Sequence, residues 1–326
     1  MSVNIAILAG GNSSEFEISM NSATQVIRHL DRKLFSPYKI VLRDKNWSYE
    51  PENGGIPVPV DKNDFSLIVS GEKITFDAVF IAIHGTPGED GKMQAYFEML
   101  DIPFTSCNSF VSALTFNKFA CKKYLEAFHV QTAPSLLTRK FLDASGIKDA
   151  GLSFPLFVKA NSSGSSFGVT KVDEAASLEE AMEHAFSESS EVLIEELITG
   201  TEVTCGVLKT KQRSILFPPT EVVPHKEYFD FEAKYMPGLA DEITPARLPD
   251  EKIRLIQDSA SRIYDYLGCR GIVRIDFILQ DDALFFLEIN TVPGLSRESI
   301  IPKQAAVYGL SATELFTLVL NDSMTR

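Results

Sequence analysis

Two acidic residues interrupt the apolar runs of RIDFILQDDALFFLEIN, the stretch from residue 274 to residue 290. Its two β-rich runs are joined by a polar turn at residues 280–282, which is the pattern of a β-hairpin. Asp276 stands in the first run and Glu288 in the second, and Asn290 follows. Oxygen ligands of this kind suit a hard cation such as Mg²⁺, which usually completes its shell with water and substrate phosphates.

The pairing of this hairpin decides whether these side chains can meet. Side chains alternate between the two faces of a strand, and we expect Ile278 to pair with Phe286. The four residues that this register places on one face, in two opposed pairs, are Asp276 with Glu288 and Arg274 with Asn290. Opposed carboxylates destabilise a strand pair unless their charge is neutralised, so the register favours a bound cation. An open hairpin face with solvated charges is the alternative.

A serine- and glycine-rich loop at residues 161–168, NSSGSSFG, follows the strand-like segment LFVKA. Its backbone N–H groups and its hydroxyls, including Ser165 and Ser166, could cradle phosphate oxygens, and Lys159 precedes it. A simple turn is the alternative. Neither GxxxxGK[ST] nor a GxGxxG after a strand occurs, so a nucleotide site here would be of neither the P-loop nor the Rossmann type.

Acids also end the apolar strand in VLIEELITGTE, residues 192–202. The carboxylates of Glu195, Glu196 and Glu202 could accept hydrogen bonds from an adenine amino group or from ribose hydroxyls. Solvated surface acids are the alternative. Lys118, inside a helical segment, reads on its own as a surface residue.

Two further candidates lie at the ends of strands in the N-terminal part, which reads as an open α/β sheet. Glu15 follows the strand VNIAILAGG, and His84 ends the strand FDAVFIAIHG. Ligands bind at the carboxyl edge of such sheets. Glu15 could bind an ammonium group or only favour the helix dipole, and His84 could face a ligand or have a structural role.

The length of 326 residues predicts two or three domains with ample core. The net charge of -13 argues against a general nucleic-acid surface, which needs clustered Lys and Arg. The first residues lack the basic region and cleavage site of a signal peptide, and no apolar run reaches the roughly 18 residues of a membrane helix. The four widely spaced cysteines match no zinc or redox motif, so we expect buried thiols in a reducing cytoplasm.

The remaining elements follow from periodicity and turn residues. The expected elements are a helix after residue 15 capped by Ser13 or Ser14, a polar excursion with short strands at 44–73, helices at 109–128 and 177–189, antiparallel strands at 200–223, a long functional loop at 224–250 and a helix at 250–267 closed by Gly268.

These motifs occur together in a characteristic order. The segments are AGGNSSEFEIS, HGTPGEDG, FVKANSSGSSFG, LIEELITGTEVT, FDFEAKY, RIDF and LEINTVPGLSRESIIP. In this order they resemble the D-alanine–D-alanine ligases, which belong to the ATP-grasp superfamily. The resemblance covers the chain from about Val3 to about Leu320, and the final segment with the preceding RID is its most specific part.

The resemblance implies a mixed α/β, three-domain ATP-grasp fold. Residues 1–106 would form an N-terminal substrate domain with an open parallel sheet, and residues 107–194 a central ATP-grasp subdomain. Residues 195–326 would form the C-terminal ATP-grasp and metal-binding domain, with a lid loop at about 224–250. The antiparallel sheets of the last two would clamp ATP.

The resemblance also implies roles for individual residues. Phosphates would be held by Lys118, Lys159, Ser165, Ser166 and Lys234; adenosine by Glu195, Leu197 and Glu202; and two Mg²⁺ ions, or Mn²⁺ in their place, by Asp276, Glu288 and Asn290. The first D-alanine would meet Glu15 and His84, the oxyanion Arg274 and the backbone of Gly294, and the second D-alanine Ser299 and Ile300. Ser165 would link Glu15 to Tyr235 and so hold the lid closed.

The implied enzyme is a cytoplasmic, homodimeric ligase that makes D-alanyl-D-alanine for peptidoglycan through an acyl phosphate, releasing ADP and phosphate. It would need no nucleic acid and no membrane. Ala160 departs from the family's common proline, and the segment 44–75 looks longer than in short members. Tyr235 in EAKY favours an amine nucleophile over D-lactate. Another ATP-grasp carboxylate–amine ligase, including one that makes depsipeptides, and a non-catalytic nucleotide sensor are the alternatives.

Overall fold

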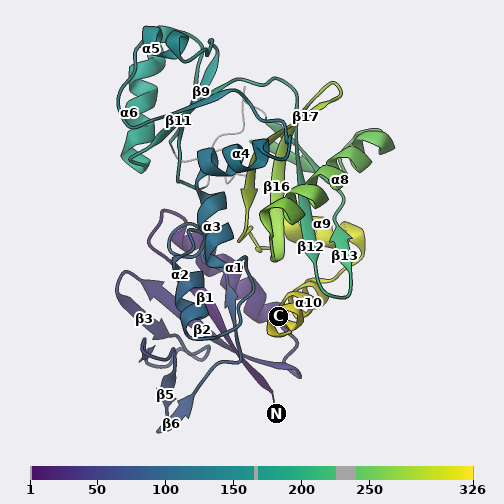
Figure 1. Cartoon of the computed structure of the whole chain (residues 1–326). Coiled ribbons are helices and arrows are strands. Elements are labelled where there is room, and N and C mark those ends of the chain that lie inside the picture. The colour runs from purple at the N-terminus through teal and green to yellow at the C-terminus, as the bar shows by residue number, and fades with distance from the viewer. Residues whose placement is uncertain (1, 165–167, 225–239, 326) are drawn as a thin grey trace.

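The structure is a computed structural model that describes residues 2–164, 168–224 and 240–325. Three main sheets follow one another along the molecule (Figure 1): a five-stranded sheet at one end, a four-stranded sheet at the other and a six-stranded sheet between them. This arrangement confirms the predicted mixed α/β architecture. No helix within these described ranges is both long and apolar enough to cross a membrane.

The five-stranded sheet is parallel at its centre and antiparallel at one edge. Its strands, in spatial order, are β4 (Val58–Pro59), β3 (Asn46–Tyr49), β2 (Phe35–Arg43), β1 (Val3–Gly10) and β7 (Ala78–Ile81). The predicted parallel sheet therefore holds for β2, β1 and β7, whereas β3 and β4 extend it in the antiparallel sense. A separate hairpin of β5 (Leu67–Val69) and β6 (Glu72–Ile74) completes the predicted polar excursion.

Both faces of the central strand β1 are covered, which explains its unbroken apolar sequence. Ile5, Ile7 and Ala9 pack in one core with residues of α1 (Phe16–His29) and of α10 (Ala312–Met324). The intervening residues, Ala6 and Leu8, pack in a second core with α2 (Lys92–Met99). The last helix of the chain thus covers the sheet that the first strand begins, a contact that the local sequence pattern does not predict.

The four-stranded sheet is antiparallel and has one covered face. Its order is β10 (Val169–Val172), β9 (Leu156–Ala160), β11 (Val192–Glu196) and β8 (Ser135–Thr138), with α5 (Ala144–Asp149), the 3₁₀ helix η1 (Ala175–Ser177) and α6 (Leu178–Glu188) nearby. Val158 and Ile194 pack with α6 in one core. Because side chains alternate, Lys159 and Glu195 project from the opposite face.

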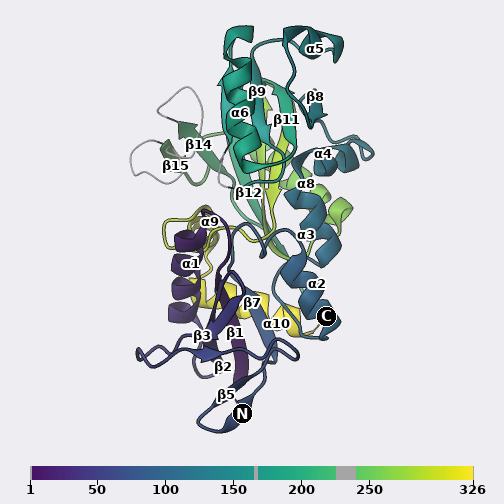
Figure 2. The same ribbon diagram turned by 90° about the vertical axis from the view of Figure 1, so that its left-hand side faces the viewer.

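The six-stranded sheet provides the facing wall. Its order is β15 (Ala240–Ile243), β14 (Thr220–Pro224), β12 (Thr201–Lys209), β16 (Gly271–Gln280) and β17 (Ala283–Asn290), and β13 (Ser214–Leu216) also pairs with β12. Val203, Ile275 and Phe277 pack in a core with α8 (Asp250–Leu267) and with residues of α3 (Ser109–Phe116) and α4 (Lys118–Glu126). The sheet runs between these helices and α9 (Ile300–Tyr308), as Figure 2 shows.

Helix boundaries confirm one of the predictions and change another. Helix α8 ends at Gly268, whose φ of 68° is the left-handed conformation that glycine adopts most easily. The predicted helix at 109–128 is two helices, because the chain is extended at Asn117, which caps α4 through a hydrogen bond from Ala120 N to Asn117 Oδ1. All four cysteines are buried and free, as expected.

The predicted register of the β16–β17 hairpin is right at the acids and wrong at the turn. Asp276 lies opposite Glu288 and Arg274 opposite Asn290, but Phe286 pairs with Phe277 instead of Ile278. A β-bulge between these regions leaves Leu287 as the extra residue on β17. The bulge lets Phe286 enter the core while Glu288, two residues later, faces the cavity.

Candidate active site

A cavity of about 930 Å³ lies between the free faces of the four- and six-stranded sheets and reaches the carboxyl edge of the N-terminal sheet. The described residues that line it include ten carboxylates and only four lysine or arginine side chains. The cationic side chains are Lys118, Lys159, Lys171 and Arg274. An anionic ligand would therefore need further positive charge, which divalent cations supply.

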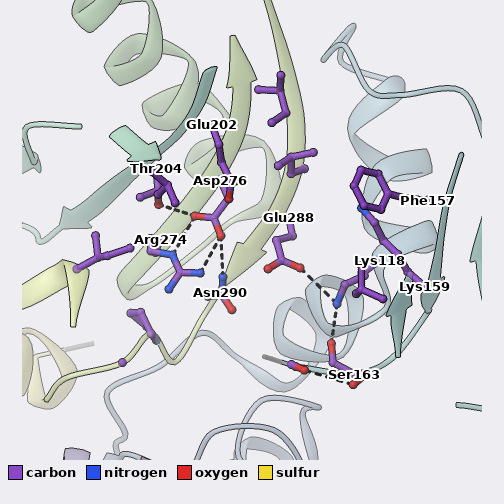
Figure 3. Close-up of a pocket in the computed structure, with 18 of the residues that line it drawn as sticks. Lys118, Phe157, Lys159, Ser163, Glu202, Thr204, Arg274, Asp276, Glu288 and Asn290 are labelled. Atoms are coloured by element: carbon purple, nitrogen blue, oxygen red, sulfur yellow. Dashed lines mark hydrogen bonds and ion pairs between the residues drawn. The ribbon is translucent and has the colours of Figure 1, made fainter. Parts of the chain in front are cut away.

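Asp276 is at the centre of a hydrogen-bonded group on one wall (Figure 3). Arg274 donates to both of its oxygens, from Nε at 2.9 Å and from a terminal nitrogen at 2.7 Å. Thr204 Oγ1 on the neighbouring strand β12 also donates to it, and Asn290 Nδ2 lies 3.4 Å from Oδ2. Sequence reasoning missed Thr204, although its position two residues after Glu202 on the same strand face was a usable signal.

Glu288 faces the other way, toward helix α4. Its carboxylate lies 3.3 Å from Lys118 Nζ, which donates to the main-chain oxygen of Ser163 at 2.6 Å (Figure 3). Lys118 is therefore not the surface residue that its local sequence suggests: it connects the serine-rich loop to the acidic hairpin. The side chain of Glu288 is 30% exposed, compared with 10% for Asp276.

Lys159 and Glu195 lie side by side on the opposite wall. Lys159 Nζ is 2.6 Å from Glu195 Oε2 and 5.2 Å from the ring centre of Phe157. The other oxygen of Glu195 accepts a hydrogen bond from Lys122, which is 1% exposed and was not predicted. Burial alone would raise the pKa of Glu195, but the charges of Lys159 and Lys122 lower this pKa to about 2.

Glu15 is held between two loops at the edge of the N-terminal sheet. It is the N-cap of α1, and neither Ser13 nor Ser14 takes that position as predicted; Ser13 Oγ instead accepts a hydrogen bond from Glu15 N. A Cβ atom on Gly164 would lie 2.4 Å from Glu15 Oε2, and one on Gly85 would lie 3.0 Å from it. The absence of side chains at these glycines thus lets both loops approach the carboxylate.

His84 is buried at the same edge and has both ring nitrogens engaged. Nε2 lies 2.8 Å from Ser22 Oγ, and Nδ1 lies 2.9 Å from the oxygen of Val292. Ser22 Oγ also accepts a hydrogen bond from Leu295 N. His84 thus lines the cavity and ties α1 to the loop that follows β17.

Glu89 is a buried cavity residue that sequence reasoning missed, although it belongs to the motif HGTPGEDG. One of its oxygens accepts a hydrogen bond from Gly85 N at 2.8 Å. Burial, followed by the neighbouring charge of Glu15, raises the pKa of Glu89 to about 8.

The loop after β17 and the start of α9 form the last part of the wall. Gly294, Ser299 and Ile300 all line the cavity, and Ser299 is the N-cap of α9. Ser299 Oγ pairs with Ser296 Oγ at 2.8 Å, so it does not cap the helix through its side chain. The first N–H groups of α9 therefore point to a region where an anion would be favoured.

The other predicted residues are placed as follows. Leu197 and Glu202 line the cavity. Ser165, Ser166, Lys234 and Tyr235, together with most of the predicted lid, lie outside the described residues.

Asp276, Glu288 and Asn290 fit a magnesium site that a substrate completes. Within the described part of the chain, no group of three or more His, Cys, Asp or Glu side chains could hold a metal ion alone. Two carboxylates and one amide face the cavity from adjacent strands. This donor set matches Mg²⁺, which takes one or two carboxylates and obtains its other ligands from water and substrate phosphates.

Comparisons with known proteins agree over the whole chain. Residues 4–107 match the family profile described as D-ala D-ala ligase N-terminus, and residues 139–321 match D-ala D-ala ligase C-terminus. The chain is 44% identical over 326 residues to a D-alanine–D-alanine ligase of Bacteroides fragilis, covering 99% of both chains.

Two solved structures show the same fold. The chain superposes on the VanG D-Ala:D-Ser ligase of Enterococcus faecalis with a TM-score of 0.87 and 31% identity, over 98% of this chain and 99% of that one. It superposes on the D-alanine–D-alanine ligase of Bacillus anthracis complexed with ATP with a TM-score of 0.79 and 27% identity, over 100% and 98% of the two chains.

Proposed function

Because the chain belongs to the D-alanine–D-alanine ligase family, we propose that its central cavity joins two D-alanine molecules at the expense of ATP. The protein is an ATP-dependent ligase that forms D-alanyl-D-alanine for peptidoglycan precursor synthesis. The observation that supports this site most directly is the meeting of Lys118, Glu288 and Asp276 with Lys159 across one cavity between two sheets. This combination of lysines and oxygen donors is what phosphoryl transfer requires.

We assign the nucleotide to the space between the four- and six-stranded sheets. Lys118 and Lys159 would bind phosphate oxygens, and Glu195, Leu197 and Glu202 would hold the adenosine. The hydroxyls of Ser165 and Ser166 and the ammonium of Lys234 complete the proposed phosphate contacts. Lys118 is well placed because Ser163 fixes it beside the serine-rich loop.

Asp276, Glu288 and Asn290 would hold two magnesium ions, with manganese as a substitute. When bound, such ions neutralise phosphate charge and align the groups for transfer. The excess of carboxylates over cationic side chains in the cavity supports this assignment.

We place the first D-alanine between the N-terminal sheet and the hairpin. Glu15 would bind its ammonium group, and His84 would hold the surrounding loops. Arg274 and the backbone N–H of Gly294 would stabilise the oxyanion, a role for which one donor typically contributes ~2.7–4 kcal/mol. The second D-alanine would place its carboxylate at Ser299 and Ile300, where the α9 N-terminus favours an anion.

The reaction then proceeds in two steps. The carboxylate of the first D-alanine attacks the γ-phosphate. ADP departs as the leaving group, and the product of this step is an acyl phosphate. The amine of the second D-alanine attacks the acyl carbonyl, and phosphate departs as the peptide bond forms. Because water would hydrolyse the acyl phosphate, a closed lid is required; we assign this lid to residues 224–250, held shut through Ser165 and Tyr235.

We also propose the larger organisation of the protein. The units would be 1–106, 107–194 and 195–326, as the resemblance implies, except that the second boundary moves to the end of β11 because that strand continues to Glu196. Met99 and Phe110, which are exposed on the contacting helices α2 and α3, are candidates for the interface of a homodimer. A cytoplasmic location agrees with free cysteines and with the use of ATP.

An assay of phosphate release tests the proposed reaction. We expect release that needs ATP, Mg²⁺ and D-alanine together, with D-alanyl-D-alanine as the product. Parallel reactions should contain D-alanine with D-lactate or with D-serine as the second substrate. A mainly lactate- or serine-dependent product at neutral pH would overturn the substrate assignment, and nucleotide binding without turnover would favour a sensor.

Glu288→Gln tests the proposed metal ligands. Loss of a group that only orients a ligand lowers activity by about 10–100-fold, so loss of the ligand itself should lower turnover by at least about 100-fold. Because Glu288 is partly exposed, the thermal midpoint should change little. Glu183→Gln, the same change at an exposed position on α6, is the matched control. Normal turnover of the Glu288 variant would rule out this ligand.

A further inference from the structure

Lys122, Glu195 and Lys159 form a row of three charges beneath the proposed nucleotide site. Glu195 lies in the middle, with Lys122 on one of its oxygens and Lys159 Nζ 2.6 Å from the other. Lys122 Nζ also donates to the oxygen of Ala133 at 3.2 Å. The side chains become more exposed toward the cavity, from 1% for Lys122 through 5% for Glu195 to 17% for Lys159.

The three elements fix this order. Lys122 follows Lys118 by one helical turn on α4, so both lysines lie on the same side of the helix. Lys118 reaches the cavity at Glu288, whereas Lys122 turns to the strand β11. On the neighbouring strands β9 and β11, Lys159 pairs with Leu193, and Glu195 is its diagonal neighbour on the same face. Of the three, Lys159 and Glu195 line the cavity, and Lys122 supports them from behind.

Removing an ammonium group from water is costly unless an opposite charge and hydrogen bonds compensate it. Burial lowers the pKa of Lys122, and the charge of Glu195 opposes that shift. With Lys159 alone, Glu195 would form a neutral pair, which would weaken attraction between Lys159 and an anion. With Lys122 present, the row carries one net positive charge, and the lysine that faces the cavity is Lys159.

We propose that Lys122 is a positioning residue for nucleotide binding: it compensates Glu195 and so leaves the charge of Lys159 available to the phosphate groups. The inference rests on the proposed role of Lys159 as a phosphate ligand. It adds a residue outside the cavity to those that set the affinity for ATP. It also makes α4 the element that controls both lysines, one directly and one through Glu195.

Lys122→Met tests the inference, with Glu195 keeping Lys159 as its remaining partner. Removing one partner of a buried ion pair is destabilising, so circular dichroism first checks that the variant is folded. The affinity for ADP with Mg²⁺, measured by titration calorimetry, should fall by about 10-fold or more, equivalent to about 1.4 kcal/mol. The KM for ATP should rise in parallel, while kcat at saturating ATP stays within about threefold. Lys123→Met removes the next charge on α4, which is half-exposed and paired with Glu126, and should leave both constants unchanged.

Two further measurements separate charge from packing. Adenosine, measured by displacement of ADP, should bind Lys122→Met as it binds the wild type, because it carries no phosphate. In the double variant Lys122→Met, Glu195→Gln, the row regains one net positive charge. Because Glu195 is also a proposed adenosine contact, recovery is measured as the ratio of ADP affinity to adenosine affinity, which should return toward the wild-type ratio. Equal losses for adenosine and ADP in Lys122→Met, or a ratio in the double variant below that of Lys122→Met, would overturn the inference.

Lys159→Met distinguishes this inference from the assignment on which it rests. If ADP binds this variant normally, the proposed role of Lys159 is wrong. If Lys159→Met weakens ADP binding but Lys122→Met behaves like Lys123→Met, the role of Lys159 stands and that of Lys122 falls.

Discussion

The buried carboxyl groups of the cavity differ in how the protein compensates their charge. Asp276 receives hydrogen bonds from Arg274 and Thr204, and Glu195 receives them from two lysines. Glu89 is held chiefly by the backbone N–H of Gly85 and lies near the like charge of Glu15. Burial and that like charge favour the neutral form of Glu89, whereas the two lysines stabilise Glu195 as an anion.

This difference predicts a pH dependence that belongs to Glu89. The pKa of Glu89 is raised from 4.5 to about 8 by burial and then by Glu15. Between these pH values the unfolded chain binds fewer protons than the folded protein, so the free energy of unfolding falls as pH rises, by at most about 1.4 kcal/mol per pH unit from this group. Glu89→Gln removes the titration and keeps an acceptor for Gly85 N.

Urea denaturation of both proteins at pH 5, 6.5 and 8 measures the effect, and these pH values span the window set by the two pKa values. The variant should gain stability relative to the wild type as pH rises. Parallel pH profiles would contradict a raised pKa for Glu89. Glu183→Gln, the same change at an exposed position on α6, is the control for general changes in charge.

The sequence predicts the parts of the site that depend on contacts between residues close in the chain. It does not predict the parts that depend on contacts between distant residues. The opposed acids of the hairpin follow from strand alternation, and their pairing is confirmed. The bulge at Leu287 does not follow, because it depends on burying Phe286 against α8 and its neighbours, which are distant in the sequence. Lys118 and Lys122 read as ordinary helix lysines, since their partners, Glu288 and Glu195, come from strands far along the chain.

Helix α9 positions two proposed site residues, and its own position is fixed by a buried glutamine. Gln304, which is fully buried, accepts a hydrogen bond from Gly206 N and donates to Thr204 O and Thr220 Oγ1. These contacts fasten α9 to β12 and β14. Ser299 and Ile300 at its N-terminus, the proposed contacts of the second D-alanine, depend on this attachment.

Gln304→Ala should therefore affect stability and one substrate more than the other. Leaving buried backbone groups unsatisfied costs about 1–3 kcal/mol each, so the free energy of unfolding should fall by at least that amount. The KM for the second D-alanine should rise more than the KM for ATP, whose proposed site lies between the four- and six-stranded sheets. Gln257→Ala breaks comparable hydrogen bonds to Leu216 O and Phe217 O from α8 and should reduce stability without this selectivity. Equal changes in both KM values would contradict the link through α9.

At the scale of the whole molecule, the two ends of the chain share one core. Strand β1, helix α1 and strand β7 pack with α10 and with Leu208 and Ile272 of the six-stranded sheet. The carboxyl edge of the N-terminal sheet, which is the proposed substrate site, and the hairpin with the proposed metal ligands are thus held in one body by apolar packing as well as by His84. A site built from residues as distant as Glu15 and Ser299 needs such a connection, because small displacements of reacting groups lower rates strongly.

Phe316→Ala tests this shared core. Phe316 is 1% exposed on α10 and lies edge-on to Phe80 of β7, with ring centres 5.7 Å apart. Its removal should lower the free energy of unfolding by about 3–5 kcal/mol.

Trp47, the only tryptophan, reports on the N-terminal sheet by fluorescence, whereas far-UV circular dichroism reports on all helices. The two urea transitions should coincide and shift together in the variant, since coincident probes indicate one cooperative unit. Val307→Ala, at a half-exposed position on α9, should stay within about 0.5 kcal/mol of the wild type. A tryptophan transition that separates from the circular dichroism transition already in the wild type would show that the N-terminal sheet unfolds on its own, and the coupling through α10 would then be too weak to align the two halves of the site.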